Sequence, residues 1–391
     1  MDNIFTKKSR IFKNKSALHE RYLPESLIER EQQIKDIADL LEPVLYNAEP
    51  QNAIISGEKG TGKTTVLRLI LRDLNEVISR EKLNLYTVFL NCEKISTASQ
   101  VILEIINYIS PETEVPKTGL AIGEYYNILW DVLNKKHSQI IIVFDNVEFL
   151  KDYNVLQTLA LAGENMHIKE DVFIGIIGIS NDLFFSEKLD TRITRSLKQK
   201  NLIFPPYDQK QISDILLRRS TLVFEDSVID ENVISLCSAL SIKKGYVHRA
   251  LALLEKAGNI AESKNELPIT NKHIYLANDE LNSEVLFESL KSLPIHSKLV
   301  LLSIIELAKE LDDKITTGQV VSKYEKLCSK IDLNPLGRTS VSKIISNFDM
   351  QRIISAPVRS RGRYGKTRLI SVKNINEIKK ALSSDYRLSD L

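Results

Sequence analysis

The chain of 391 residues is too long for one ordinary hydrophobic core, and its 43% hydrophobic and 27% charged residues are typical of a globular protein. No apolar run reaches the roughly 18 residues of a membrane-spanning helix, and the basic N-terminus lacks the apolar core of a signal peptide. The three cysteines are too scattered for a CxxC pair or a disulfide framework. These features argue against a membrane protein and a disulfide scaffold, and they predict a cytoplasmic protein of two or three domains.

The net charge of +2 conceals an uneven distribution along the chain. From Lys291 onward there are 19 Lys and Arg against 10 Asp and Glu, whereas the first 290 residues carry 34 against 41. A basic C-terminal part on an acidic body is typical of a protein with a polyanion-binding module. A solvated basic face would give the same counts, so charge alone leaves both interpretations open.

The first two hundred residues alternate between helical and extended patterns. After a loose basic arm at 1–20, apolar residues at helical spacing follow the start signals Pro24 and Ser26 and predict a helix. Strand patterns then alternate with helical patterns; the strands fall at 51–57, 83–92, 140–145 and 172–180, and the helices at 66–78, 98–110, 123–136 and 154–163. This alternation predicts a parallel sheet covered by helices on both faces.

The pattern changes near residue 208, where the strands stop. Helical patterns fill 208–290, and a last segment from about 291 predicts three helices followed by two β-like stretches at 352–358 and 367–372. A basic turn that contains glycine joins those two stretches. The chain therefore continues from an α/β part into a helical part and a small mixed part.

The sequence GEKGTGKTT, which follows the first strand and opens a helix, satisfies the pattern G-x-x-x-x-G-K-[ST]. Its glycines let backbone N–H groups surround phosphate oxygens, and the helix N-terminus adds a partial positive charge. Lys63 can reach the β- and γ-phosphates, and the Thr64 hydroxyl can bind Mg²⁺. The predicted nucleotide ligands of this loop are Gly57, Gly60, Thr61, Gly62, Lys63, Thr64 and Thr65.

The run IIIVFDNVE predicts a buried strand that ends at Asp145, which would bind Mg²⁺ together with Thr64. Taken alone, Asp145 could instead cap a helix. Asn146 follows where many ATPases carry a glutamate, and an amide can orient a water but cannot accept its proton. On a continuing strand Glu148 would lie about 6.6 Å farther along, too far to substitute. We therefore expect nucleotide binding with weak hydrolysis.

These motifs together resemble the AAA+ ATPases, and more closely the archaeal origin-recognition initiator family, which is related to eukaryotic origin-recognition and helicase-loading subunits. The resemblance covers nearly the whole chain and is carried by RYLPESLIEREQQI, GEKGTGKTT, IIIVFDNVE and FPPYDQKQISDILLRR. It implies an α/β AAA+ P-loop domain with a parallel sheet, an α-helical lid and a C-terminal winged-helix domain. The expected ranges are a basic N-terminal arm at 1–20, the AAA+ base domain at 21–206, the lid at 207–289 and the winged helix at 290–391.

The resemblance also implies roles for residues outside the phosphate loop. Asn181 in IGISND would be the polar tip of the first sensor, Arg192 in LDTRITRSL would reach a neighbouring subunit's nucleotide, and Tyr207 and Arg219 would contact nucleotide from the lid. The segment VPKTGLAIGEYYNILWDVL resembles the helical insertion that these initiators place against DNA. Each residue has an ordinary alternative: Asn181 as a turn cap, Arg192 as a surface arginine and Tyr207 as lid core.

The lid motif departs from the family pattern Gly-Asp-Ala-Arg. The sequence here is GYVHR, so His248 holds the sensor position, and a histidine is mostly neutral at pH 7. Arg249 is adjacent, but one residue along a helix turns a side chain by about 100°. It is therefore a poor substitute for the sensor arginine, and the alternative is that it points to solvent.

The last segment resembles a winged helix whose recognition helix is GRTSVSKIISNF, with Val341, Ile344 and Ile345 facing inward. The wing is basic: from Arg352 to Lys373 there are seven basic residues and no acidic one. A solvated hairpin that keeps a sheet edge from aggregating is the alternative. The predicted DNA contacts are Arg338, Thr339, Ser342, Lys343, Arg359, Arg361, Gly362, Arg363, Tyr364, Lys366 and Arg368.

The resemblance implies a replication initiator that recognises double-stranded origin DNA, with ATP or ADP and Mg²⁺ serving as a conformational switch. Its expected partners are other initiator paralogues and the replicative helicase, with no membrane, in the cytoplasm at the nucleoid. One alternative is a regulatory paralogue that binds origins without loading helicase. Another is a true ATPase motor or P-loop kinase, against which Asn146 and the basic wing both argue.

Overall fold

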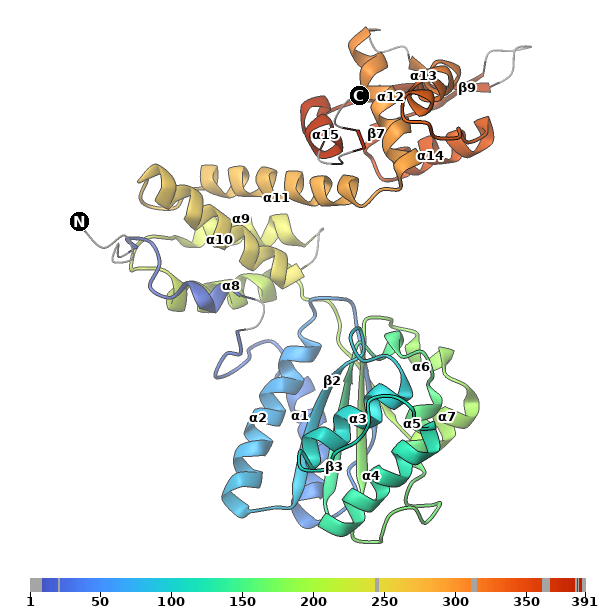
Figure 1. The fold of residues 1–391 in the computed structure, drawn as a ribbon. Coiled ribbons are helices and arrows are strands. Elements are labelled where there is room, and N and C mark those ends of the chain that lie inside the picture. Colours follow the sequence, from blue (N-terminus) through green and yellow to red (C-terminus); the bar gives the residue numbers. More distant parts are fainter. Residues whose placement is uncertain are drawn as a thin grey trace, which may run out of the picture. The chain divides into compact units, whose positions relative to one another are not determined.

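The computed structural model describes residues 9–19, 22–242, 246–310, 315–360, 366–383, 385 and 387–388. The chain divides into two units, Met1–Ile274 and Tyr275–Leu391, and the ribbon in Figure 1 shows the elements of each. The first unit holds an α/β base domain and a helical lid, and the second holds the winged helix. No helix in the described ranges is long and apolar enough to cross a bilayer.

The base domain is built on one five-stranded parallel sheet in the order β2-β3-β4-β1-β5. Its strands are β1 (Ala53–Ser56), β2 (Leu85–Asn91), β3 (Gln139–Asp145), β4 (Ile174–Ser180) and β5 (Lys200–Ile203). Every residue of β3 and β4 is buried because helices cover both faces of the sheet. Because parallel strands end at one edge, the residues that follow β1, β3 and β4 are brought together there.

Two hydrophobic cores lie on opposite faces of this sheet. Alternate residues of β3 divide between them: Ile142 belongs to one core and Val143 to the other. Helices α1 (Glu31–Leu41) and α2 (Lys63–Glu81) contribute to the core that holds Val143. The core that holds Ile142 takes residues from α3 (Ala98–Ile109), α4 (Ile122–Lys136), α5 (Asn154–Ala160) and α7 (Thr191–Leu197). Figure 1 shows α3, α4, α5 and α7 over one face of the sheet.

The lid consists of α8 (Gln209–Val223), α9 (Glu231–Ser241), α10 (Tyr246–Lys264) and the start of α11 (Asn271–Lys291). The N-terminal arm packs against it. Phe12 forms a β-bridge with Phe224, with ring centroids 5.3 Å apart, and a Cβ added at Gly258 on α10 would lie 2.4 Å from the Phe12 ring. The prediction of a loose arm is therefore wrong for residues 11–18, where Ile11, Phe12, Ala17 and Leu18 are buried.

Several elements differ from the sequence-based expectation. The first helix begins at Glu31 rather than near Ser26, because Glu29 has a positive φ of 66° and Arg30 is not helical. Strand β5 was not predicted, since only Leu202 of its four residues is buried and an edge strand has no continuous apolar run. The short helices α6 (Phe185–Lys188) and α7 were also missed.

The second unit has the helix and strand order of a winged helix. Three helices, α12 (Ile295–Glu310), α13 (Thr317–Lys330) and α14 (Arg338–Met350), surround a core that includes the fully buried Tyr324. The unit also contains an antiparallel sheet, in which β9 (Lys366–Val372) pairs with β6 (Ile315–Thr316), β7 (Ile354–Ser355) and β8 (Val358–Ser360). Strand β6 and the last helix α15 (Ile375–Leu382) were not predicted.

We predict that Phe12→Ala weakens the lid, because it removes a buried ring from between α8 and α10 and costs about 3 kcal/mol of unfolding free energy. Hydrogen exchange measured on the full chain should show faster exchange of α8 and α10 amides. The exposed Lys210→Ala on α8 serves as the control and should leave exchange unchanged. Unaltered protection in Phe12→Ala would contradict the docked arm.

Candidate nucleotide site and DNA interface

The phosphate loop depends on three glycines between β1 and α2. Gly60 and Gly62 have φ values of 85° and 90°, which side chains rarely adopt. Gly57 lies so close to the next chain segment that an added Cβ would be 2.5 Å from the Phe204 carbonyl oxygen. A Cβ at Gly62 would be 2.7 Å from the Tyr207 hydroxyl. Both the turn and the approach of the tyrosine therefore require the absence of side chains here.

Lys63 is only 4% exposed, and its ammonium group is held inside the loop. It donates to the carbonyl oxygens of Gly57 (2.7 Å) and Glu58 (2.8 Å) and to Oδ1 of Asn181 (3.1 Å). Burial lowers the pKa of Lys63 to about 8, although the charges of Glu148, Asp145 and Glu58 oppose this shift. The lysine, the loop and the tip of β4 thus form one hydrogen-bonded group.

Thr64 and Asp145, the two residues predicted to bind Mg²⁺, are in direct contact. The Thr64 hydroxyl donates to Oδ1 of Asp145 at 3.0 Å, and Asp145 is 6% exposed at the end of β3. Burial raises the pKa of Asp145, while the bond from Thr64 opposes the shift. A buried carboxylate beside a hydroxyl is a hard oxygen donor set that suits Mg²⁺. The helix-cap alternative does not hold, because Asn146 occupies the N-cap position of the following turn.

The chain does not continue as a strand beyond Asp145. Asn146 takes a left-handed conformation with φ 57° and ψ 50°, and the 3₁₀ turn η4 (Val147–Phe149) follows. The assumption that Glu148 lies farther along the same strand is therefore wrong. Instead, Glu148 Oε1 accepts hydrogen bonds from the backbone N of Asn181 (3.1 Å) and from its Nδ2 (3.2 Å).

Asn181 joins the two sides of the site. Its Nδ2 also donates to Oδ1 of Asn146 at 2.7 Å, while its Oδ1 accepts from Lys63. The predicted sensor therefore contacts the phosphate loop and the segment after β3 at the same time, rather than serving as a simple turn cap.

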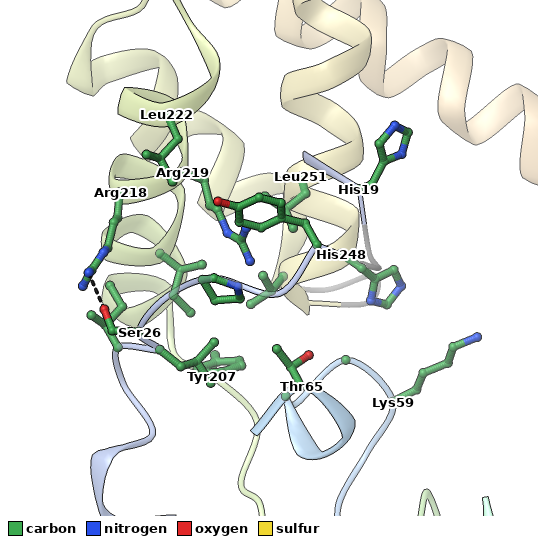
Figure 2. A pocket seen from close by; sticks show the side chains of 18 residues that line it. His19, Ser26, Lys59, Thr65, Tyr207, Arg218, Arg219, Leu222, His248 and Leu251 are labelled. Carbon is green, nitrogen blue, oxygen red and sulfur yellow. Dashed lines mark hydrogen bonds between the residues drawn. The ribbon is translucent and has the colours of Figure 1, made fainter. Parts of the chain in front are cut away.

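A cavity of about 220 Å³ lies between the phosphate loop and the lid. Figure 2 shows Thr65 and Lys59 on the loop side, with Arg219 and His248 on the lid side. Gly60, Gly62 and Tyr207 also line this cavity. Three predicted loop residues thus line the pocket with the predicted lid residues, and the other four, Gly57, Thr61, Lys63 and Thr64, are not among its lining residues.

Tyr207 and Arg219 both line the pocket, and different contacts hold each side chain there. Tyr207 is 6% exposed and lies under the guanidinium of Arg30, 3.7 Å from its ring centroid. Arg219 stacks over the ring of Tyr22 at 4.5 Å and donates to the Ala17 carbonyl oxygen at 3.2 Å. The N-terminal segment therefore holds Arg219 in place, which was not expected from the sequence.

Arg30 is a residue of this site that the sequence analysis missed. It is 2% exposed, and it donates from Nε to the Thr61 carbonyl oxygen (3.0 Å) and from Nη2 to that of Pro205 (2.6 Å). One guanidinium thus ties the phosphate loop to the chain that leads into the lid. A charged residue just before a helix is typical of the surface, so only its place in the RYLPESLIEREQQI signature could have marked it.

The two candidate lid sensors face different environments. His248 lines the cavity together with Val247 and Leu251. Arg249 is 9% exposed, so the alternative that it points to solvent is wrong. Burial also lowers the pKa of Arg249.

Arg192 lies on α7, away from the residues that line the cavity. Its side chain is 77% exposed, and it pairs with Asp190 at 3.2 Å. The segment predicted as a DNA-contacting insertion forms a loop at 115–121 and then α4, whose Leu129 and Leu133 are buried in the base core. The contact of Arg192 with a neighbouring subunit and the contact of the insertion with DNA therefore stay predictions.

Helix α14 is amphipathic in the way a recognition helix requires. Val341 and Ile345 are fully buried, and Ile344 packs against the same core. The opposite side carries the predicted DNA contacts: Arg338, Thr339 and Lys343 are exposed, and Ser342 is half-buried. The inward packing of this helix is as expected.

The wing is an antiparallel hairpin of β8 and β9, in which Arg359 pairs with Thr367 and is exposed. Arg368, unlike the exposed Arg359, is held by hydrogen bonds within the unit: it donates to the Ala356 carbonyl oxygen (2.9 Å) and to Ser346 Oγ (2.7 Å). It braces β9 against α14. The predicted contacts at the hairpin tip, Arg361, Gly362, Arg363 and Tyr364, and the side chain of Lys366 lie outside the described residues.

Family models match three successive parts of the chain. The AAA ATPase domain matches residues 26–168, the Cdc6 AAA+ ATPase-type lid domain matches 213–279, and the CDC6 C-terminal winged helix domain matches 288–381. These matches agree with the architecture described above: a parallel-sheet base, a helical lid and a winged helix.

Similar proteins extend over the whole chain. An ORC1-type DNA replication protein from Pyrococcus furiosus is 37% identical over 399 residues, covering 100% of this chain and 95% of the relative. One from Archaeoglobus fulgidus is 36% identical over 392 residues with the same coverage. The structure of the Aeropyrum pernix ORC1 protein in complex with DNA is 35% identical, covers 98% of this chain and 100% of its own, and has a TM-score of 0.79. The chain therefore belongs to the ORC1-type family of archaeal DNA replication initiators, with an AAA+ domain, a Cdc6-type lid and a C-terminal winged helix.

Proposed function

We propose that this protein recognises double-stranded origin DNA. We also propose that ATP or ADP, bound with Mg²⁺ between base domain and lid, changes its affinity for that DNA. The observation that carries the proposal is the exposed polar face of α14 beside the basic hairpin of β8 and β9. The similar ORC1 protein of Aeropyrum pernix was solved in complex with DNA, which supports the same role for this winged helix.

The nucleotide part of the proposal rests on the phosphate loop and the cavity above it. Lys63 and the loop amides would hold the phosphates, and Thr64 with Asp145 would hold Mg²⁺, which supplies positive charge at the phosphates. Tyr207, Arg219 and His248 would contact the nucleotide from the lid side.

The switch works through the lid. Arg30 contacts both the phosphate loop and Tyr207, so a change at the phosphates reaches the chain that opens α8. ATP and ADP would then favour different angles between base and lid, and these angles decide whether base domain and winged helix engage one duplex together. A ligand shifts this balance only by its difference in affinity for the two states.

Hydrolysis is a minor part of this proposal. Asn146, at the usual position of the general base, cannot act as one, and loss or displacement of that base lowers a rate by as much as about 10²–10⁴-fold. His248 in place of a sensor arginine removes a positive charge near the γ-phosphate at neutral pH. Binding and exchange of nucleotide, rather than rapid turnover, would set the state of the protein.

The proposed partners are other initiator paralogues and the replicative helicase. The exposed Arg192 is available for a neighbouring subunit, since its only described ion pair is with the nearby Asp190. A second candidate function is a regulatory paralogue that occupies origins without loading helicase, which Asn146 and His248 favour.

We predict preferential binding to origin DNA over random duplex of the same length. Specific protein–DNA complexes are typically about 10³-fold or more tighter than non-specific ones at physiological salt. A competition shift assay with the purified full chain measures the ratio directly. Equal affinity for both duplexes at physiological salt would remove origin recognition from the proposal.

We predict that the double substitution Arg361→Ala and Arg363→Ala weakens DNA binding and flattens its salt dependence. If each arginine contacts one phosphate, the slope of log K against log salt should fall by about 2. The matched control is Lys379→Ala with Lys380→Ala, which removes the same charge from the exposed side of α15. The control should bind as the wild type does; an unchanged slope in the arginine variant would show that the wing does not contact DNA.

A further inference from the structure

We infer that Glu148, and not Asn146, accepts the proton of the attacking water in whatever ATP hydrolysis this site performs. The inference rests on the proposed nucleotide site and names a residue outside the position where such ATPases carry their glutamate. It follows from the hydrogen bonds that connect Lys63, Asn181, Asn146 and Glu148.

The orientation of the Asn181 amide is fixed by its neighbour. The ammonium group of Lys63 can only donate, so the atom of Asn181 that faces it at 3.1 Å must be the oxygen Oδ1. The amide nitrogen Nδ2 therefore points to the other side, where it has two acceptors, Asn146 Oδ1 at 2.7 Å and Glu148 Oε1 at 3.2 Å.

Asn146 cannot be the base. Its oxygen accepts the hydrogen bond from Asn181 and keeps a second lone pair, but an amide oxygen is too weakly basic to take a proton from water at neutral pH. The left-handed backbone of Asn146, with φ 57°, is also one that asparagine adopts more readily than most residues.

Glu148 carries a carboxylate, which is the basic group that Asn146 lacks. Its Oε1 accepts from the backbone N and the Nδ2 of Asn181, which fixes the carboxylate in place. Its Oε2 is buried and receives no hydrogen bond from any residue in the described ranges. A buried carboxylate oxygen without a donor is costly, and a water molecule is the donor that would satisfy it.

The position of Glu148 relative to the phosphate loop agrees with this role. The Lys63 ammonium group donates to Oδ1 of Asn181, and Nδ2 of the same amide donates to Glu148 Oε1, so one amide group separates the lysine from the carboxylate. The η4 turn that follows Asn146 therefore brings Glu148 close to the lysine that would hold the γ-phosphate, even though it is not on the strand.

The proposed hydrolysis needs no reactant other than ATP and water. The water oxygen forms a bond to the γ-phosphorus, and the bond from that phosphorus to the β,γ-bridging oxygen breaks with its electron pair remaining on ADP. The proton of the water passes to Glu148 Oε2 and from there to the released phosphate. Asn181 has no part in the proton transfer and acts as a positioning residue for the carboxylate.

The test is single-turnover ATP hydrolysis by the full chain, with ATP affinity measured separately by fluorescence anisotropy of a labelled ATP. Glu148→Gln keeps an oxygen that can accept from Asn181 but loses the base, so we expect hydrolysis at least about a hundredfold slower with unchanged ATP affinity. Glu93→Gln, an exposed residue after β2, removes the same charge and should behave as the wild type.

Three results would overturn the inference. Glu148→Gln with the wild-type rate would show that the carboxylate is not the base, and a parallel loss of affinity and rate would show a structural role only. A wild type that binds ATP but never hydrolyses it would remove the catalytic role and leave the proposed function intact. A wild type that fails to bind ATP would contradict the proposed function itself.

Discussion

A buried ammonium group needs acceptors on every side that water does not reach, and this requirement at Lys63 organises the site. The acceptors are two carbonyl oxygens of the phosphate loop and the amide oxygen of Asn181 at the tip of β4. The loop can supply its carbonyls only because Gly60 and Gly62 permit its turns. The amide can reach the lysine only because β1 and β4 are neighbouring parallel strands.

A second buried cation, Arg30, connects the phosphate loop to the lid. Its acceptors are the carbonyl oxygens of Thr61 and Pro205, with the ring of Tyr207 beneath it. Since these acceptors belong to the phosphate loop and to the entrance of the lid, the arginine makes the position of one depend on the other. The docked N-terminal segment adds a third support, because Ala17 and Tyr22 hold Arg219 at the cavity.

The parts of this site that could be predicted from the sequence depend on local patterns and on sheet topology. The spacing of the phosphate loop identifies Lys63 and Thr64, and the end of a buried strand identifies Asp145, because parallel strands end at one edge. The resemblance placed Asn181 at the same edge. The amphipathic pattern of α14 likewise gave its buried face.

The remaining features depend on contacts between distant residues or on single backbone angles. Arg30 is buried by a partner 175 residues away, and no local pattern indicates that. The burial of Phe12 depends on Phe224 and Gly258. The place of Glu148 follows from one left-handed residue, Asn146, which turns the chain away from the direction of β3.

If the nucleotide at Lys63 controls binding to DNA, the affinity for origin DNA must differ between the ATP-bound and ADP-bound states, and both affinities can be measured on the purified chain. Coupling of this kind is typically about 5–150-fold, and linkage requires that DNA change the ratio of ATP to ADP affinity by the same factor. We expect at least about a fivefold difference, with the same factor from both measurements. Equal DNA affinity with ATP, with ADP and without nucleotide would show that the nucleotide does not control DNA binding.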